Sequence, residues 1–174
     1  KAEQRKWWLY NRFRYLDSKY NAGDAVEDYI LLRTYGKSDL QITPYADIYA
    51  SAKFDEILVQ KRALRGQTYT LENPLDDGNH GVLSIFSASQ LSSVGDLSGL
   101  KLSMGDFSMA TKLSSLKIGS NAYGYKNENL TELTVGNLTL LREIDVRNCS
   151  NLVKPVDLSG CTNIERVYLD GTRV

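Results

Sequence analysis

The chain contains few of the residues from which metal centres and catalytic sites are usually built. Its 174 residues include two cysteines and a single histidine, His80. A zinc site takes about four cysteine, histidine or acidic ligands, so a cysteine–histidine zinc site is excluded. A histidine-based triad would depend on one side chain in the glycine-rich stretch DDGNHG, without a nucleophile motif beside it. We therefore expect no metal, no cofactor and no enzymatic activity.

Long apolar runs and an excess of charge of one sign are also missing. No run of about 18 apolar residues occurs, so no transmembrane helix is predicted, and the start KAEQRKWW lacks the apolar core of a signal peptide. The 21 basic and 21 acidic residues balance, which argues against electrostatic capture of nucleic acid or an anionic membrane by the whole chain. Since the first residue is not methionine, we expect a fragment of a longer polypeptide.

A regular apolar repeat occupies the last third of the chain. Four segments read apolar-x-x-apolar-x-apolar, and two steps between them span about 22 to 23 residues, within the roughly 20 to 29 residues of a leucine-rich repeat coil. A short alternating segment buries its apolar face only when another segment stacks on it, so the pattern predicts stacked strands. The central residues, at steps of 11, 12 and 11, are Leu133, Ile144, Val156 and Val167, and looser copies run through Leu97, Leu100 and Leu102 and through Leu113, Leu116 and Ile118.

Residues typical of tight corners follow these segments. They stand two positions after each final apolar residue and tolerate left-handed backbone: Asn137, Asn148, Gly160 and Gly171. Cys149 and Cys161 occupy equivalent places in successive segments. We predict two small buried side chains there, because half a coil of separation is too far for a disulfide.

The repeated segments resemble the bacterial leucine-rich repeat family, in the variety whose coils read NLTELTV, LLREIDVRNC and NIERVYLDG. The resemblance implies a right-handed solenoid and the recognition of protein partners. Both halves of each coil carry the strand pattern, so we expect little or no convex helix. The insert GSNAYGYKNEN is expected to loop out, where Tyr123 and Tyr125 either anchor the loop or contact a sugar or a partner.

The first third of the chain is aromatic and basic. In WWLYNRFRYLDSKY the apolar residues recur at helical spacing, which predicts an amphipathic helix. Asp24 and Glu27 form a capping box for a second predicted helix, DAVEDYILLRTY, which Gly36 ends. Six basic residues against two acidic ones in residues 1–20 raise a nucleic-acid hypothesis. No groove-reading motif accompanies them, and docking of the helix on its own chain or on a partner subunit is expected instead.

Tyrosine and tryptophan are concentrated in the same region. Both tryptophans and seven of the 11 tyrosines fall within the first 50 residues. Such side chains are enriched where proteins meet, and packing of a helix against a sheet is the alternative use. The candidate partner-binding residues are Trp7, Trp8, Tyr10, Phe13, Tyr15, Tyr123 and Tyr125.

The middle of the chain reads as strands. Residues 42–54 alternate between apolar residues and polar or aromatic ones, Pro44 predicts an edge strand or a bulge, and two more strands flank Gly66. We therefore predict an α+β fold. Its parts are a helical segment at 1–38, a small β module at 39–75, a linker and capping coil at 76–96, and a leucine-rich-repeat-type β solenoid at 97–174 that continues beyond the fragment.

The order of the blocks WWLYNRFRYLDSKYNAGDA, LQITPYADIYASAKF and IFSASQLSSVGDLSGL is similar to that of large structural proteins encoded by phages and prophages of gut bacteria. This resemblance implies a virion or tail-associated protein and brings no functional residues. We expect a non-enzymatic structural protein of the phage particle. Its expected partners are other virion subunits, with a host-surface protein or glycan as a further candidate; nucleic acid and membrane are not expected. The alternatives are a bacterial cell-surface repeat adhesin and, third, a glycan-cleaving tail enzyme.

Overall fold

The computed structural model describes residues 28–75, 81–121 and 127–174, and this part of the chain is nearly all β. It contains no α-helix; its helical turns are η1 (Ala88–Gln90) and η2 (Ser98–Leu100). The strands are β1 (Tyr29–Thr34), β2 (Leu40–Pro44), β3 (Ile48–Phe54), β4 (Ile57–Ala63), β5 (Tyr69–Leu71), β6 (Gly81–Phe86), β7 (Leu91–Ser93), β8 (Leu102–Asp106), β9 (Ser115–Lys117), β10 (Glu132–Thr134), β11 (Glu143–Asp145) and β12 (Arg166–Tyr168).

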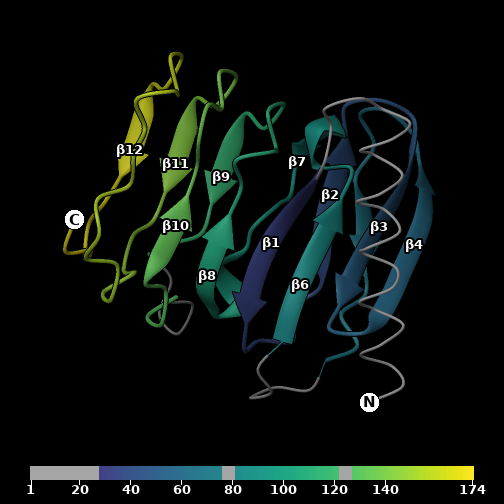
Figure 1. The fold of residues 1–174 in the computed structure, drawn as a ribbon, viewed down its shortest axis with the longest axis horizontal. Coiled ribbons are helices and arrows are strands. Elements are labelled where there is room, and N and C mark those ends of the chain that lie inside the picture. Colours follow the sequence, from purple (N-terminus) through teal and green to yellow (C-terminus); the bar gives the residue numbers. More distant parts are fainter. Residues whose placement is uncertain (1–27, 76–80, 122–126) are drawn as a thin grey trace.

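Three sheets contain these strands, which follow one another along the molecule from β12 at one end to β4 at the other (Figure 1). The largest sheet has the order β10-β8-β1-β6-β3-β4 and is mixed, because β10 runs parallel to β8 while the other neighbours are antiparallel. A second sheet, β12-β11-β9, is parallel. The third sheet, β5-β2-β7, is antiparallel.

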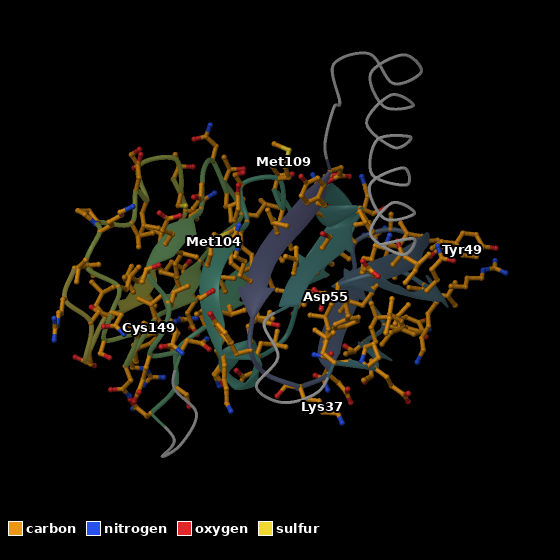
Figure 2. All side chains as sticks on the ribbon, turned by 60° about the horizontal axis from the view of Figure 1, so that its bottom comes forward. Lys37, Tyr49, Asp55, Met104, Met109 and Cys149 are labelled. Atoms are coloured by element: carbon orange, nitrogen blue, oxygen red, sulfur yellow. The ribbon has the colours of Figure 1, made fainter. Side chains whose placement is uncertain are left out.

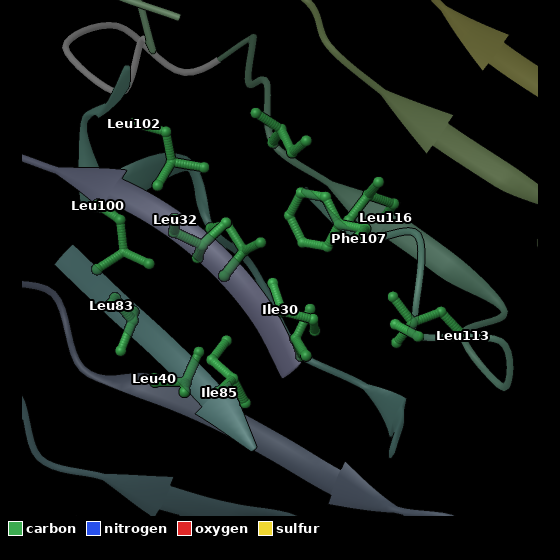
Figure 3. Close-up of a cluster of buried hydrophobic side chains, with 14 of the residues drawn as sticks. Ile30, Leu32, Leu40, Leu83, Ile85, Leu100, Leu102, Phe107, Leu113 and Leu116 are labelled. Atoms are coloured by element: carbon green, nitrogen blue, oxygen red, sulfur yellow. The ribbon is translucent and has the colours of Figure 1, made fainter. Parts of the chain in front are cut away.

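Alternation of side chains explains how one sheet faces another. In β1, Ile30 and Leu32 are buried and pair with Ile85 and Leu83 of β6. Successive residues of a strand point to opposite faces, so these side chains lie on one face of the large sheet. Figure 3 shows them in one cluster with Leu40 of β2 and with Phe107 and Leu116, so a continuous core joins the N-terminal strands to the repeat segments.

The structure contradicts the predicted α+β class. The second predicted helix, DAVEDYILLRTY, is wrong, since its second half is β1, held between β6 and β8. Tyr, Ile and Thr favour strands, and two strand partners outweigh a local capping box. The first predicted helix, the segment at 76–80 and the loop at 122–126 lie outside the described residues.

The predicted solenoid is also wrong as the architecture of the C-terminal half. Strands β8 and β10, from the expected solenoid, belong to the same mixed sheet as β1, and β6, from the expected linker and capping coil, pairs with β1 and β3. The periodicity indicates which side chains point inward, but it does not specify which strand lies at each edge. The division at residues 38, 75 and 96 stays a prediction, although the large sheet takes strands from all four segments.

Several local predictions are confirmed. The register of β2 against β7 shifts between Thr43 and Pro44, which is the expected irregularity. Cys149 and Cys161 are free and buried. Asn148 and Gly171 have the left-handed φ of 61° and 77°. Asn137 and Gly160 have no such φ, so the left-handed corners predicted there are wrong. A Cβ at Gly160 would lie 2.8 Å from the Cα of Asn137, so close packing explains this glycine.

Candidate functional site

The parallel sheet of β9, β11 and β12 presents a charged surface. Leu116 and Ile144 point into the core, so their strand neighbours point outward. In-register pairing then arranges the outward side chains in rows across the sheet. We call this surface the charged face; its residues are Ser115, Lys117, Glu143, Arg166, Tyr168 and Asp145, which is buried beneath Arg147 at the end of β11.

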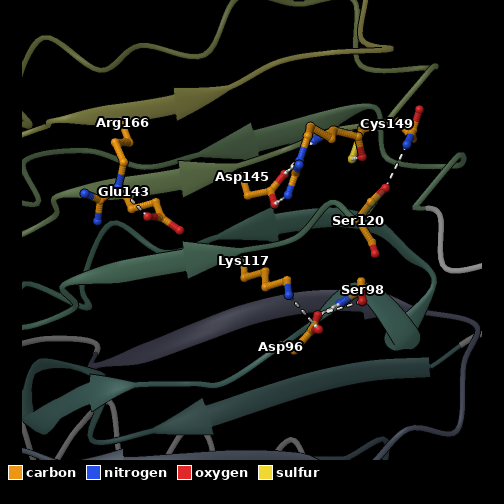
Figure 4. Close-up of polar contacts among 10 residues, drawn as sticks. Asp96, Ser98, Lys117, Ser120, Glu143, Asp145, Cys149 and Arg166 are labelled. Carbon is orange, nitrogen blue, oxygen red and sulfur yellow. Dashed lines mark hydrogen bonds and ion pairs between the residues drawn. The ribbon is translucent and has the colours of Figure 1, made fainter. Parts of the chain in front are cut away.

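Ion pairs cross from strand to strand along this surface. Arg166 Nε lies 2.7 Å from Glu143 Oε2, and Arg142 Nη1 lies 2.8 Å from Glu165 Oε1 (Figure 4 shows the first pair). Both pairs are exposed to solvent, where an ion pair contributes little to stability. Their effect is to hold long side chains in a regular array.

One row across the sheet consists of Lys117, Asp145 and Tyr168, with Asp145 in the middle. Arg147 donates from Nε and Nη2 to the two carboxylate oxygens of Asp145, at 3.0 and 2.6 Å, and its guanidinium lies 4.9 Å from the ring centroid of Tyr168. Burial acts to raise the pKa of Asp145, but the hydrogen bonds from Arg147 and the positive charges of Arg147 and Lys117 outweigh it and lower the pKa. The carboxylate therefore stays charged although it is buried.

A polar cleft of about 600 Å³ adjoins Lys117. Lys117 Nζ lies 3.3 Å from Asp96 Oδ2, while the Ser98 hydroxyl and amide donate to Asp96 Oδ1 at 2.6 and 2.9 Å (Figure 4). Burial acts to raise the pKa of Asp96, but the bonds from Ser98 and the charge of Lys117 lower it overall. The cleft is lined by Ser38, Asp39, Gln41, Thr70, Asp96, Ser98, Gly99, Lys117 and Ser120.

A repeated turn orients these carboxylates, and our reading of the sequence missed it. Each aspartate accepts the backbone N–H of the residue two positions later, at 2.9 to 3.0 Å, in Asp96-Leu-Ser, Asp106-Phe-Ser, Asp145-Val-Arg and Asp157-Leu-Ser. Aspartate commonly bonds to its own backbone in this way at turns. The recurring D-x-S pattern is the signal that could have found the turns at Asp96, Asp106 and Asp157, whereas Asp145-Val-Arg departs from that pattern.

The site consists of charged side chains that are held in fixed positions by their neighbours. Each carboxylate described above is engaged by a neighbouring donor or cation, so the face offers alternating charges in set positions. In the described part of the chain no three histidine, cysteine or acidic side chains gather in a way that could hold a metal ion. The same residues contain no helix long and apolar enough to cross a bilayer.

The candidate residues singled out from the sequence are not placed by the structure. All seven, from Trp7 to Tyr15 and at Tyr123 and Tyr125, lie outside the described residues, so their role in partner binding stays a prediction. Another aromatic residue from the tyrosine-rich region, Tyr49, is exposed near the β4 end, far from Cys149 (Figure 2). It does not contribute to the charged face.

Comparison of the chain with models of known families, with characterised proteins and with solved structures finds no match. The resemblances to leucine-rich repeat proteins and to phage structural proteins therefore stay predictions.

Proposed function

We propose that this chain is a non-enzymatic structural and binding protein that recognises a partner protein through the charged face, as a component of a phage or prophage particle. The observation that supports the binding role is the cluster of Asp145, Arg147 and Tyr168. Arginine and tyrosine are residue types on which binding energy concentrates, and here a carboxylate already orients the guanidinium over the ring.

A surface whose side chains are already ordered before binding loses less free energy when a partner binds. Ordering a long side chain on binding costs about 0.5 to 1.5 kcal/mol, and the strand-to-strand ion pairs reduce that cost because they already restrain Arg142 and Arg166. Alternating signs also favour a partner with the complementary pattern and oppose others. The assignment to a phage particle depends on the resemblance in the order of the sequence blocks.

Mass spectrometry of purified particles, combined with lysine cross-linking, tests both parts of the proposal. The particles would come from an induced lysogen that carries the gene. We expect peptides of this chain at stoichiometric abundance, and cross-links from Lys117 to another virion subunit. Lys61, on β4 at the far end of the large sheet, is the internal comparison.

Two further observations sharpen the test. Replacing Arg166 and Tyr168 by alanine should abolish the cross-links from Lys117, whereas replacing Lys61 and Arg62 of β4 should not. Recovery of the chain on the cell surface and not in particles would favour the adhesin alternative. Cross-links to a partner only from Lys61 would show that the charged face is not the binding surface.

A further inference from the structure

Part of the large sheet is buried on the side that faces away from the core. In β6, Leu83 and Ile85 point into the core, so Ser84 and Phe86 point to the opposite side. Both are nevertheless only 2% exposed, and Lys53 of β3, which pairs with Ser84, is 6% exposed. We call these buried residues on the outer side of β3 and β6 the covered patch; they are Ser51, Lys53, Ser84 and Phe86.

The other two sheets lie on the inner side of the large sheet. Their buried residues, among them Leu40 of β2 and Leu116 of β9, belong to the same core cluster as Leu83 (Figure 3). Phe86 is buried outside that cluster, and its ring meets Tyr29 of β1 edge to face, with 6.3 Å between the ring centroids. In the described part of the chain no strand is layered over the outer side of β3 and β6. The cover therefore comes from residues outside the described ranges.

Three stretches are candidates for this cover: 1–27, 76–80 and 122–126. The second stretch leads into Gly81, which pairs with Thr34 at the opposite end of β1 from Phe86. The third precedes β10, which is separated from β6 by β8 and β1. The first leads directly into β1, whose first residue, Tyr29, pairs with Phe86. Both its position and its length favour the N-terminal stretch.

Residues 7–20 have the sequence pattern that such a cover requires. Large apolar residues recur at steps of four, three and four positions, which places them along one side of a helix; they are Leu9, Phe13, Leu16 and Tyr20. From the first to the last of them a helix rises about 16 Å, and four neighbouring strands span about 14 Å. One apolar stripe is therefore long enough to cross β1, β6 and β3.

We infer that residues 7–20 form an amphipathic helix whose apolar side packs on the covered patch of the same chain. A few residues join this segment to β1, so it is held near the patch at a high effective concentration. The patch has a boundary on β3, where Tyr49, on the same side as Lys53, is 74% exposed. Phe13, a candidate partner-binding residue, then contributes to the chain's own fold. The inference is independent of the charged face, which belongs to a different sheet.

The amine of Lys53 reports whether the patch is covered. Its rate of modification by an N-hydroxysuccinimide ester is measured in the full 174-residue chain by peptide mass spectrometry, beside that of Lys61, an exposed residue of β4. Burial lowers the pKa of Lys53, while the charge of Glu56 acts to raise it. A lowered pKa by itself makes an amine more reactive, so slow modification indicates coverage. We expect Lys53 to react at least about tenfold more slowly than Lys61.

Two double variants identify the covering segment. Phe13→Asp with Leu16→Asp places two charges in the apolar stripe, and it should raise the rate at Lys53 to within about threefold of the exposed lysine. Asn11→Asp with Ser18→Asp adds the same charge on the opposite side of the predicted helix. This control should leave the protection of Lys53 unchanged.

Alkylation of the two buried cysteines checks that the core of each variant stays folded. If they become reactive in the variant with the charged stripe, Phe13→Ala takes its place. Modification of Lys53 as fast as that of Lys61 in the wild type would overturn the inference, and so would full protection in a charged-stripe variant with an intact core. Protection that falls on dilution would also overturn it, because a second copy of the chain would then be the cover.

Discussion

Arg147 donates two hydrogen bonds to the carboxylate of Asp145: Nε lies 3.0 Å from Oδ1 and Nη2 lies 2.6 Å from Oδ2. The two residues are only two positions apart, at the end of β11, and the aspartate is buried while the arginine reaches out over Tyr168. The negative charge of this buried carboxylate is thus compensated by Arg147, in the turn that follows the same strand. The same pair therefore stabilises the buried carboxylate and positions the Arg147 guanidinium over Tyr168.

Replacing Arg147 by leucine should lower the thermal unfolding midpoint by several degrees. The substitution leaves the buried Asp145 carboxylate with its backbone donor and the charge of Lys117 but without the cation that hydrogen-bonds to it, and a poorly compensated buried charge is unfavourable. Differential scanning calorimetry at pH 7 measures the effect. Arg166→Leu is the matched control, because the Glu143–Arg166 pair is exposed and its loss should change the midpoint little. Equal shifts would show that Asp145 does not need Arg147.

The lowered pKa of Asp145 predicts a loss of stability in acid. A carboxyl group whose pKa is lower in the folded than in the unfolded state adds stability above the unfolded value, about 4. That stability is lost as the pH falls through the folded value. Denaturant unfolding between pH 7 and pH 2.5 should show a steeper fall for the wild type than for Asp145→Asn. Parallel profiles would mean that other carboxyl groups dominate.

Ile144 and Val167 occupy the same position in neighbouring layers but should respond differently to truncation. Ile144→Ala removes packed core atoms and should cost about 3 kcal/mol. Val167→Ala acts on a half-exposed side chain and should cost less than about 1 kcal/mol. Urea unfolding of the two variants gives both values. A similar cost at both positions would mean that Val167 is covered in solution.

The buried thiols should resist alkylation. Burial, with a smaller contribution from the charge of Asp145, raises the pKa of Cys149 to about 12, and burial also raises the pKa of Cys161. The thiolate is the reactive form. Iodoacetamide at pH 8, followed by mass spectrometry, should label both residues far more slowly in the native protein than in guanidinium. Fast labelling of Cys149 in the folded protein would place it at the surface.

Predictions from the sequence succeeded for features that depend on a few neighbouring residues, such as the alternation of a strand or the conformation of a turn. Alternation around Ala50 and Ala52 corresponds to strand β3, and the repeat spacing correctly identified Leu116 and Ile144 as core residues. The left-handed turn at Asn148 follows from the tolerance of asparagine for positive φ. Predictions failed where partners distant in the sequence decide, as at residues 29–34, which were predicted to be helical and form strand β1 between β6 and β8.

The candidate site was not predicted for the same reason. Lys117, Asp145 and Tyr168 lie far apart in the sequence, and only parallel in-register pairing brings them into one row. Arg147 is near Asp145 in the chain, but the burial that makes their pair significant comes from the surrounding layers. A turn pattern such as D-x-S could have been read from the sequence; its position beside the cleft could not.

The sequence by itself determined that Leu116 and Ile144 face inward, that a left-handed turn falls at Asn148 and that the cysteines are buried, because periodicity and backbone preference act within a few residues. Only the tertiary structure decided the sheet order, the union of β1 with β8 and the row of charges on the charged face. Strand pairing depends on which segments meet across the whole chain, and its backbone hydrogen bonds are available to almost any sequence. The choice among pairings is therefore made by the packing of the complete core.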